Sequence, residues 1–415
     1  MNADCCGHAA KSDLLGIEET LDRLLTRHWS PPPSESLPLE AALGRILADP
    51  VVSPMDVPPW DNSAMDGYAI RHQEVPQAGT RLPVSQRITA GRPAWPLEPG
   101  TAARIFTGAP VPEGADAVVV QEVCSRDGDW VEVGATLTPG ANIRRAGEDI
   151  RRGQEILAAG IRLQPQHLGL AASVGVDRVQ VYSRPRVALL CSGDELVLPG
   201  QPLGPGQIYN SNRFVLGGLL QGLGCEVRHL GVIEDSLEAT CQALAVAAGQ
   251  ADLVLATGGV SVGEEDHVKA AVERLGTLEL WKVAIRPGKP LAFGSIQGVP
   301  FFGFPGNPVS AIVTFWLFAR PFILRLQGRS GDIAPLSLQA RADFAWPKPD
   351  KRPEYVRARR RRNDAGELVV QVYPSRSSGV LSSVAWADGL VVIPGSRVIQ
   401  PGDRLEFLPF EGLLG

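Results

Sequence analysis

The hydrophobic residues follow two kinds of spacing, which divide the chain into helical and strand-rich regions. In residues 13–29 leucine recurs at nearly helical spacing, which predicts an amphipathic helix that three consecutive prolines end. Residues 38–48 predict a second helix, and residues 154–176 return to a helix-like pattern. We expect these helical stretches to pair as one discontinuous linker domain, built from residues 10–50 and 140–182.

Two other regions have short apolar runs separated by many turn residues. Residues 51–139 are rich in proline and glycine and carry β-type runs such as 117–120, which predicts an irregular β domain. After residue 330 the predicted strands are again short, at 355–361, 368–373, 390–393 and 404–407. They predict a small C-terminal β-barrel over residues 329–415.

From residue 186 onwards, apolar strand-like runs alternate with helical runs. The predicted strands are 187–191, 226–231, 253–257, 279–283, 291–294 and 299–304. The predicted helices are 211–223, 236–249, 266–275 and 308–326. This alternation predicts a parallel sheet with helices on both faces, a three-layer α/β/α domain over residues 183–328. Ligands of such sheets bind beyond the carboxyl ends of the strands.

The composition is that of a soluble globular protein, with 44% hydrophobic and 20% charged residues among 415. A chain of this length is expected to form about two to four domains. A net charge of −5 offers no broad basic surface, so we expect no nucleic-acid partner. We expect no membrane partner either, because no signal peptide is apparent and the most apolar helical segment, 311–319, is too short to span a bilayer.

The six cysteines are scattered and form no CxxC pair. Cys191 and Cys225 lie in apolar runs, which indicates reduced thiols and a cytoplasmic protein. Cys5 and Cys6 stand near His8, but no further ligand is close in the sequence, so we expect no metal site there.

The stretch 257–263 reads TGGVSVG and joins an apolar strand to a helix. Gly258, Gly259 and Gly263, with Ser261 between them, allow backbone N–H groups to face an anion at the helix N-terminus. The spacing matches neither the dinucleotide-binding nor the P-loop fingerprint. An ordinary strand-to-helix turn is the alternative interpretation.

Carboxylates follow three of the predicted strands, at Glu195, Asp235 and Asp266. For Asp235, in front of a helical run, a helix N-cap is the alternative. Like charges about 4 Å apart repel by roughly 4 kcal/mol at an effective dielectric constant near 20, so carboxylates beside a phosphate need a cation. Mg²⁺ bridges carboxylate and phosphate oxygens, and we therefore expect these three residues to form a metal-assisted site.

Positive charge is supplied by the segment that contains Lys282, Arg286 and Lys289. It lies between two predicted strands, at the edge of the sheet where ligands are expected. A solvated surface run is the alternative, and we favour binding of an oxyanion.

A further turn, FPGNPVS, precedes the last helix of the α/β domain. Asn307 is suited to cap a helix that starts at Pro308, where the missing N–H costs nothing. The free N–H groups of the first turn, together with the Ser310 hydroxyl, would form a second anion site. A helix cap without any ligand is the alternative.

In the last domain Arg357, Arg359 and Arg361 alternate along one predicted strand. Most charge runs are only solvated, but one arginine directed at the sheet edge would add a bidentate contact to an anion.

Taken together, these motifs resemble the molybdopterin molybdenumtransferase family, which includes the bacterial MoeA proteins and the E domain of gephyrin. The resemblance covers nearly the whole chain, in the same order. The matching segments are DNSAMDGYA (61–69), FTGAPVPEGADAVV (106–119), GEDI (147–150), SGDEL (192–196), TGGVSVGEEDHV (257–268), RPGKP (286–290) and FPGNPVS (304–310).

The resemblance implies a linker domain, a β domain, a molybdopterin-binding α/β domain and a C-terminal barrel, assembled as an elongated homodimer. It implies a transferase that inserts molybdate into adenylylated molybdopterin, releases AMP with the help of Mg²⁺ and yields molybdenum cofactor. Possible further partners are the molybdopterin adenylyltransferase and other proteins of this pathway. The site would lie between the α/β domain of one protomer and the β domain of its partner.

The resemblance also assigns roles to individual residues. The residues expected to act on the reacting groups are Asp66, Thr107, Asp149, Glu195, Asp235 and Asp266, the first three from the partner subunit. The residues expected to bind the pterin, its phosphates or molybdate are Gly258, Gly259, Ser261, Gly263, Lys282, Arg286, Lys289, Pro305, Pro308, Ser310, Arg357 and Ser378. Some family members carry lysine in place of Arg286, which keeps the charge but not the forked geometry.

Two other functions are compatible with parts of this pattern. A molybdopterin adenylyltransferase would use a similar α/β domain but would not need the additional β domains. A scaffold without catalytic activity would need neither the acidic nor the basic residues.

Overall fold

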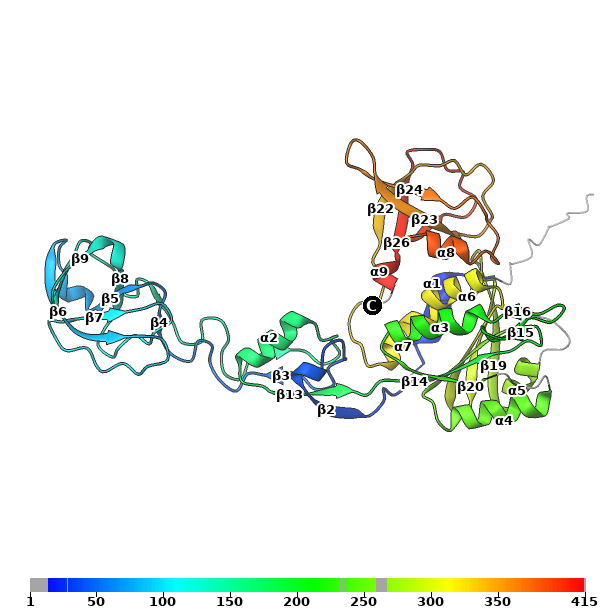
Figure 1. The fold of residues 1–415 in the computed structure, drawn as a ribbon, viewed down its shortest axis with the longest axis horizontal. Coiled ribbons are helices and arrows are strands. Elements are labelled where there is room, and N and C mark those ends of the chain that lie inside the picture. The colour runs from blue at the N-terminus through cyan, green and yellow to red at the C-terminus, as the bar shows by residue number, and fades with distance from the viewer. Residues whose placement is uncertain (1–13, 28, 232, 234–235, 259–266, 414–415) are drawn as a thin grey trace, which may run out of the picture.

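The computed structural model describes residues 14–27, 29–231, 233, 236–258 and 267–413. The molecule is elongated (Figure 1). A six-stranded β domain lies at one end, a narrow linker follows, and the α/β domain and the C-terminal barrel lie together at the other end.

A seven-stranded sheet forms the centre of the α/β domain, in the order β1-β19-β20-β21-β18-β14-β17. Its strands are β1 (Leu14–Leu15), β14 (Arg186–Cys191), β17 (Glu226–His229), β18 (Leu253–Thr257), β19 (Gly276–Val283), β20 (Pro290–Ile296) and β21 (Val299–Phe304). Alternate residues of β14 enter different cores: Leu189 packs with α3 on one face, and Leu190 packs with α4 on the other. The prediction of three layers is confirmed.

Helices cover both faces of this sheet. The helices α1 (Ile17–Leu25), α3 (Ser211–Gly222), α6 (Pro308–Thr314) and α7 (Arg320–Leu326) contribute to one core. The helices α4 (Leu237–Ala248) and α5 (His267–Leu275) contribute to the other.

The sheet is mixed, whereas the alternation of runs predicted a parallel one. Strand β20 runs antiparallel to both of its neighbours, β19 and β21. No helix separates these three strands in the sequence, and only Gln297 and Gly298, both with positive φ, connect β20 to β21. A two-residue connection makes a hairpin, because a parallel crossover needs a dozen or more residues.

The helix predicted over 308–326 is continuous through Pro321, with a π-helical turn (η4, Phe315–Ala319) in the middle. Its length and hydropathy match those of a membrane span, but 89% of the apolar window is buried inside the molecule. It therefore serves as a core helix.

The N-terminal segment differs from the prediction. The helix α1 packs in the core of the α/β domain, and β1 pairs with β19, so residues 14–25 are not part of the linker. The predicted second helix over 38–48 is also wrong. Strand β2 (Ser34–Pro38), which pairs with β13 (Arg178–Tyr182), ends at the first residue of this range, and only a 3₁₀ turn (η1, Leu39–Ala41) follows.

The linker is held by two short ribbons and a small core. Besides β2 and β13, strand β3 (Val51–Val52) pairs with β12 (Glu155–Leu157). The helix α2 (Pro165–Ser173) contributes Ala171 to this core.

The two β regions are built differently. The terminal β domain has the strand order β8-β5-β7-β6-β10-β9, and a ribbon of β4 (Asn62–Ser63) with β11 (Ile143–Arg144) leads into it. Its main strands are β5 (Gly67–Ile70), β6 (Thr80–Ile88), β7 (Ala102–Ile105), β8 (Ala117–Val120), β9 (Cys124–Asp127) and β10 (Trp130–Val133).

The C-terminal domain is a closed barrel in the order β22-β24-β23-β25-β26. Its elements are β22 (Leu338–Ala342), β23 (Glu354–Arg362), β24 (Leu368–Val372), α8 (Ser382–Trp386), β25 (Gly389–Ile393), β26 (Arg404–Pro409) and α9 (Phe410–Leu413). The barrel prediction is confirmed, although strand β22 was not predicted.

Candidate active site

A cavity of about 550 Å³ lies where strands β14, β18 and β21 end at the carboxyl edge of the sheet. Polar groups and backbone form much of its wall. The lining residues are Ser192, Glu195, Leu196, Ile208, Ser211, Asn212, Thr257, Gly258, Gly306, Asn307, Pro308, Gly379 and Leu381. The last two belong to the barrel, so two domains of the chain form this cavity.

Hydrogen bonds join the turns after β18 and β21 beside the cavity. The amide of Asn212 donates to Thr257 Oγ1 (3.0 Å) and to the carbonyl of Gly306 (2.7 Å). The Thr257 hydroxyl in turn donates to the carbonyl of Pro305 (3.1 Å). Gly258 has φ of +81°, and a Cβ at this position would lie 2.3 Å from the carbonyl oxygen of Ser192. Only glycine fits this conformation and this close approach.

The start of α6 closes another side of the cavity. The helix begins at Pro308, as predicted, but Asn307 makes no side-chain capping bond and lines the cavity instead. The N–H of Val309 donates to the carbonyl of Ser378 in the barrel (3.0 Å). One of the N–H groups that were expected to bind an anion is therefore already used to attach the barrel loop.

The basic loop between β19 and β20 packs against the same helix. A Cβ on Gly288 would lie 2.5 Å from the Thr314 hydroxyl and 3.4 Å from the carbonyl oxygen of Ser310. Lys282, near the end of β19, and Lys289, the last residue of this loop, are exposed, and no ion pair is found for either among the residues described. Both ammonium groups are therefore available to an anion.

Arg286, in contrast, is occupied by carboxylates. Its guanidinium donates to Asp350 Oδ2 (2.9 Å) and lies 3.7 Å from Glu354 Oε2. Both acids belong to the barrel, so Arg286 joins two domains, and its predicted oxyanion contact stays a prediction.

Arg357 is also engaged within the protein. It is 2% exposed, and it donates to the Ser383 hydroxyl (2.9 Å) and to the carbonyls of Ser375 and Ser377 (2.8 and 3.2 Å). Burial lowers the pKa of its guanidinium. These contacts hold the loop that carries Ser378, and the predicted bidentate anion contact stays a prediction.

The acidic part of the predicted site is only partly described. Glu195 is exposed and lines the cavity, whereas Asp235 and Asp266 lie outside the described residues. Gly259, Ser261 and Gly263 lie outside them as well. Within the described part of the chain, no group of three or more His, Cys, Asp or Glu side chains is arranged to hold a metal ion.

Asp66 and Thr107 form a pair at the far end of the molecule. Oδ1 of Asp66 accepts hydrogen bonds from the Thr107 N–H (2.8 Å) and hydroxyl (2.7 Å), and these bonds lower the pKa of the carboxyl. The pair lies at the ends of β5 and β7, which Figure 1 shows far from the α/β sheet. Asp149 is exposed after β11, and its N–H donates to the carbonyl of Val57. Within one chain, none of these three residues reaches the cavity.

The described cysteines do not contribute to the site. All four are free, and burial raises the pKa of the thiols of Cys191 and Cys225 to about 11 and about 12. Thiols with such pKa values remain protonated at neutral pH and are poor nucleophiles and metal ligands.

Some residues of this region were not predicted from the sequence. Asn212 is the main example, because it lies in the first turn of α3 and joins two strand ends. An asparagine two residues after the helix-capping Asn210 was the available signal. Glu354 carried no local signal, since its contact with Arg286 joins segments distant in the sequence.

Three family models match most of the chain. They describe a MoeA N-terminal region (domain I and II), a probable molybdopterin binding domain and a MoeA C-terminal region (domain IV). The matched residues are 15–175, 188–325 and 339–410, respectively.

Relatives of known sequence and structure agree with these models. The chain is 40% identical to a molybdopterin molybdenumtransferase of Haemophilus influenzae, over 97% of this chain and 100% of that protein. It is 38% identical to a molybdopterin molybdenumtransferase of Nostoc, over 89% of this chain and 87% of that protein. A solved structure of a molybdopterin biosynthesis MoeA protein from Pyrococcus horikoshii OT3 aligns with a TM-score of 0.81 and 29% identity, covering 95% of this chain and 100% of that one.

Proposed function

This chain belongs to the MoeA family and is a molybdopterin molybdenumtransferase of molybdenum cofactor biosynthesis; we propose that its substrates are adenylylated molybdopterin and molybdate. The observation that carries the proposal is the cavity at the carboxyl edge of the sheet, because the Gly258 turn, the start of α6 and a barrel loop meet there. Ligands of α/β sheets bind at this edge.

The charges around the cavity suit an anionic substrate. Lys282 and Lys289 are exposed at the carboxyl end of β19 and in the loop that follows it, and their ammonium groups would attract phosphate and molybdate oxygens. The Gly258 turn keeps the backbone close to the ligand, since no side chain stands in between. The reaction cleaves the phosphoanhydride of the adenylylated pterin, releases AMP and leaves molybdenum on the two dithiolene sulfurs of the product.

Mg²⁺ is proposed as the cation of this site. The Glu195 carboxylate on the cavity wall is a hard oxygen ligand of the kind that Mg²⁺ prefers, so the described donor fits the ion. Asp235 and Asp266 complete the proposed set. When bound, Mg²⁺ offsets the negative charge of the phosphates.

We also propose that the active unit is a homodimer in which the partner's β domain completes the site. Support comes from the shape of the molecule, because β5 and β7 lie at the opposite end from the cavity (Figure 1). Two-fold symmetry would bring the Asp66–Thr107 pair of each protomer to the cavity of its partner. Such a site would be incomplete in the monomer.

The first test measures AMP release from adenylylated molybdopterin, with and without molybdate and Mg²⁺, and scores the product by reconstitution of an apo-molybdoenzyme. AMP release that depends on molybdate, together with active cofactor, is expected. Asp266→Asn should abolish turnover while the fold is kept, and normal activity of this variant would contradict the metal site.

A variation of this assay separates the alternatives. With molybdopterin and ATP in place of the adenylylated substrate, formation of adenylylated pterin would indicate an adenylyltransferase. Tight binding of the pterin without any AMP release would indicate a scaffold.

A further inference from the structure

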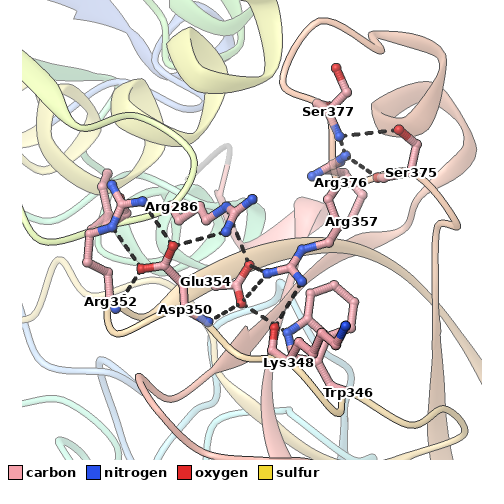
Figure 2. Close-up of polar contacts among 11 residues, drawn as sticks. Arg286, Trp346, Lys348, Asp350, Arg352, Glu354, Arg357, Ser375, Arg376 and Ser377 are labelled. Carbon is pink, nitrogen blue, oxygen red and sulfur yellow. Dashed lines mark hydrogen bonds and ion pairs between the residues drawn. The ribbon is translucent and has the colours of Figure 1, made fainter.

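A cluster of charged residues lies at the junction of the barrel and the α/β domain (Figure 2). At its centre is Glu354, the first residue of β23, which is 3% exposed. Burial of a carboxylate is costly unless each oxygen is paired and hydrogen-bonded. The partners of Glu354 therefore indicate what this buried charge does.

Glu354 is fully engaged by groups of its own domain. Nη2 of Arg376 donates to both of its oxygens, at 2.8 and 2.6 Å. The indole N–H of Trp346 and the backbone N–H of Asp350 donate to Oε1, each at 3.0 Å. The guanidinium of Arg376 also lies 4.5 Å from the ring centroid of Trp346 and donates to the carbonyl of Lys348 (3.0 Å). Arg376 is thus held in one orientation.

Arg376 belongs to the loop that reaches the cavity, residues 374–379, here called the barrel loop. In the same loop the carbonyl of Ser378 accepts from the first turn of α6, and Gly379 lines the cavity. Arg357 also holds the loop, through the carbonyls of Ser375 and Ser377 on either side of Arg376. Through Arg376, the Glu354 carboxylate therefore fixes the middle of a loop that forms part of the cavity wall.

The second connection leads to the basic loop, residues 284–289. Nε of Arg286 lies 3.7 Å from Glu354 Oε2, and its Nη1 donates to Asp350. Backbone bonds join the same segments, because the Arg286 N–H donates to the carbonyl of Pro353 (2.9 Å) and the Tyr355 N–H to the carbonyl of Arg286 (2.7 Å). The basic loop carries Lys289 and packs on α6 through Gly288.

We propose that Glu354 is a positioning residue that holds the barrel loop, through Arg376, and the basic loop, through Arg286, in the geometry that binds the anionic substrate. The inference rests on the proposed function, because it assigns this geometry to the binding of molybdate. Glu354 touches no reacting atom, and its effect on the reaction is transmitted by the two loops.

A positioning role and a purely structural role differ in their kinetics. If the loops are misplaced, the Michaelis constant for molybdate rises, while the rate constant at saturation and the Michaelis constant for the pterin change little. If Glu354 only stabilises the barrel, the fraction of active protein falls and no Michaelis constant changes. Misplaced supporting residues around a site commonly cost about tenfold or more.

The experiment uses full-length protein with Glu354→Gln, Arg376→Gln and Arg376→Lys, and the assay of AMP release described above. We expect the first two variants to raise the Michaelis constant for molybdate about tenfold. Arg376→Lys keeps the charge and should restore part of the loss. Arg376 has a side chain that is 34% exposed, so its variants keep the test available if Glu354→Gln does not fold.

The matched control is another Arg–Glu pair of the same barrel. Arg341 and Glu367 form an ion pair of 2.8 Å between β22 and the end of the hairpin that leads to β24. Glu367→Gln and Arg341→Gln should leave the kinetic constants unchanged. An equal rise in the Michaelis constant for these controls, or no rise for the Glu354 and Arg376 variants, would overturn the proposal.

Hydrogen exchange separates this proposal from the proposed function, since it needs no substrate. Glu354→Gln should increase amide exchange in both the barrel loop and the basic loop, and unchanged exchange in the two loops would refute the positioning role. If the unmodified protein releases no AMP, the proposed function fails, but the exchange result still decides whether Glu354 holds both loops.

Discussion

Gly258 shows how a single backbone conformation supports the candidate site. Its φ of +81° disfavours a side chain, and a Cβ added there would lie 2.3 Å from the carbonyl oxygen of Ser192. We expect Gly258→Ala to lower the free energy of unfolding by about 1–3 kcal/mol, through strain, and to reduce AMP release by at least about tenfold. Denaturant unfolding and the activity assay test both effects.

The matched control is Gly169→Ala in the exposed helix α2, where an added Cβ meets no atom within 4 Å. This change should raise the free energy of unfolding by about 0.5–1 kcal/mol, because alanine loses less backbone entropy than glycine in a helix. A stable and active Gly258→Ala variant would contradict the steric argument.

The pair of Asp66 and Thr107 predicts a measurable pH effect. Two hydrogen bonds from Thr107 lower the pKa of the Asp66 carboxyl from its usual value of 3.8. Because the folded value is the lower one, the stabilisation is present above the unfolded pKa and is lost as the pH falls through the folded pKa. The stabilisation is therefore lost at pH values below about 4.

Thr107→Val removes the hydroxyl and keeps the backbone N–H, so we expect the pKa of Asp66 to rise part of the way to its usual value. Carbon-13 NMR titration of the carboxyl measures this shift. An unchanged pKa would mean that the hydroxyl bond contributes nothing in solution.

Among the helices and strands, the core helix over residues 308–326 is joined to α9 by the side chain of Arg320. This side chain is 2% exposed and donates to the carbonyls of Leu413, Ile333 and Gly412 at 2.7, 2.8 and 3.2 Å. Burial lowers its pKa to about 10, so it remains charged at neutral pH. One buried cation thus supports both α9 and the segment that connects the two domains.

Arg320→Met should leave these carbonyls without a donor and lower the free energy of unfolding by roughly 2–4 kcal/mol. Arg325→Met, on the exposed face of the same helix, should cost less than about 1 kcal/mol. Chemical unfolding of the two variants compares them. Equal losses would show that burial of the Arg320 contacts is not what stabilises this end of the chain.

Most elements of the α/β domain were predictable because each strand and helix has a periodic apolar pattern of its own. Strand β18 has the predicted bounds, Leu253–Thr257, and the helix from Pro308 begins at the predicted proline. The direction of β20 and the conformation of residues 38–48 were not predictable in this way. Both depend on pairing with a strand elsewhere in the chain. The local spacing of apolar residues carries no information about that pairing.

At the scale of the whole molecule, the proposed dimer predicts complementation between two inactive variants. Asp66→Asn disables the β domain, and Glu195→Gln disables the α/β domain. In a mixed dimer one site receives both changes and the other receives none, so co-expression should restore about a quarter of normal activity. The AMP assay on each variant alone and on the mixture measures this, and no restoration would indicate a site within one protomer.

By itself, the sequence determined the kinds of residue available and the domains that present them. The motifs of the MoeA family, the periodic patterns of the α/β domain and the three-layer architecture were all readable, because they depend on neighbours along the chain. The tertiary structure alone decided which charges have partners within the protein. Arg286 and Arg357 were predicted as anion contacts from the sequence, and the structure adds that Asp350 and Glu354 pair with the first and that loop carbonyls accept hydrogen bonds from the second. A charge binds whichever partner lies nearest in space, and that distance is set by packing of segments far apart in the sequence.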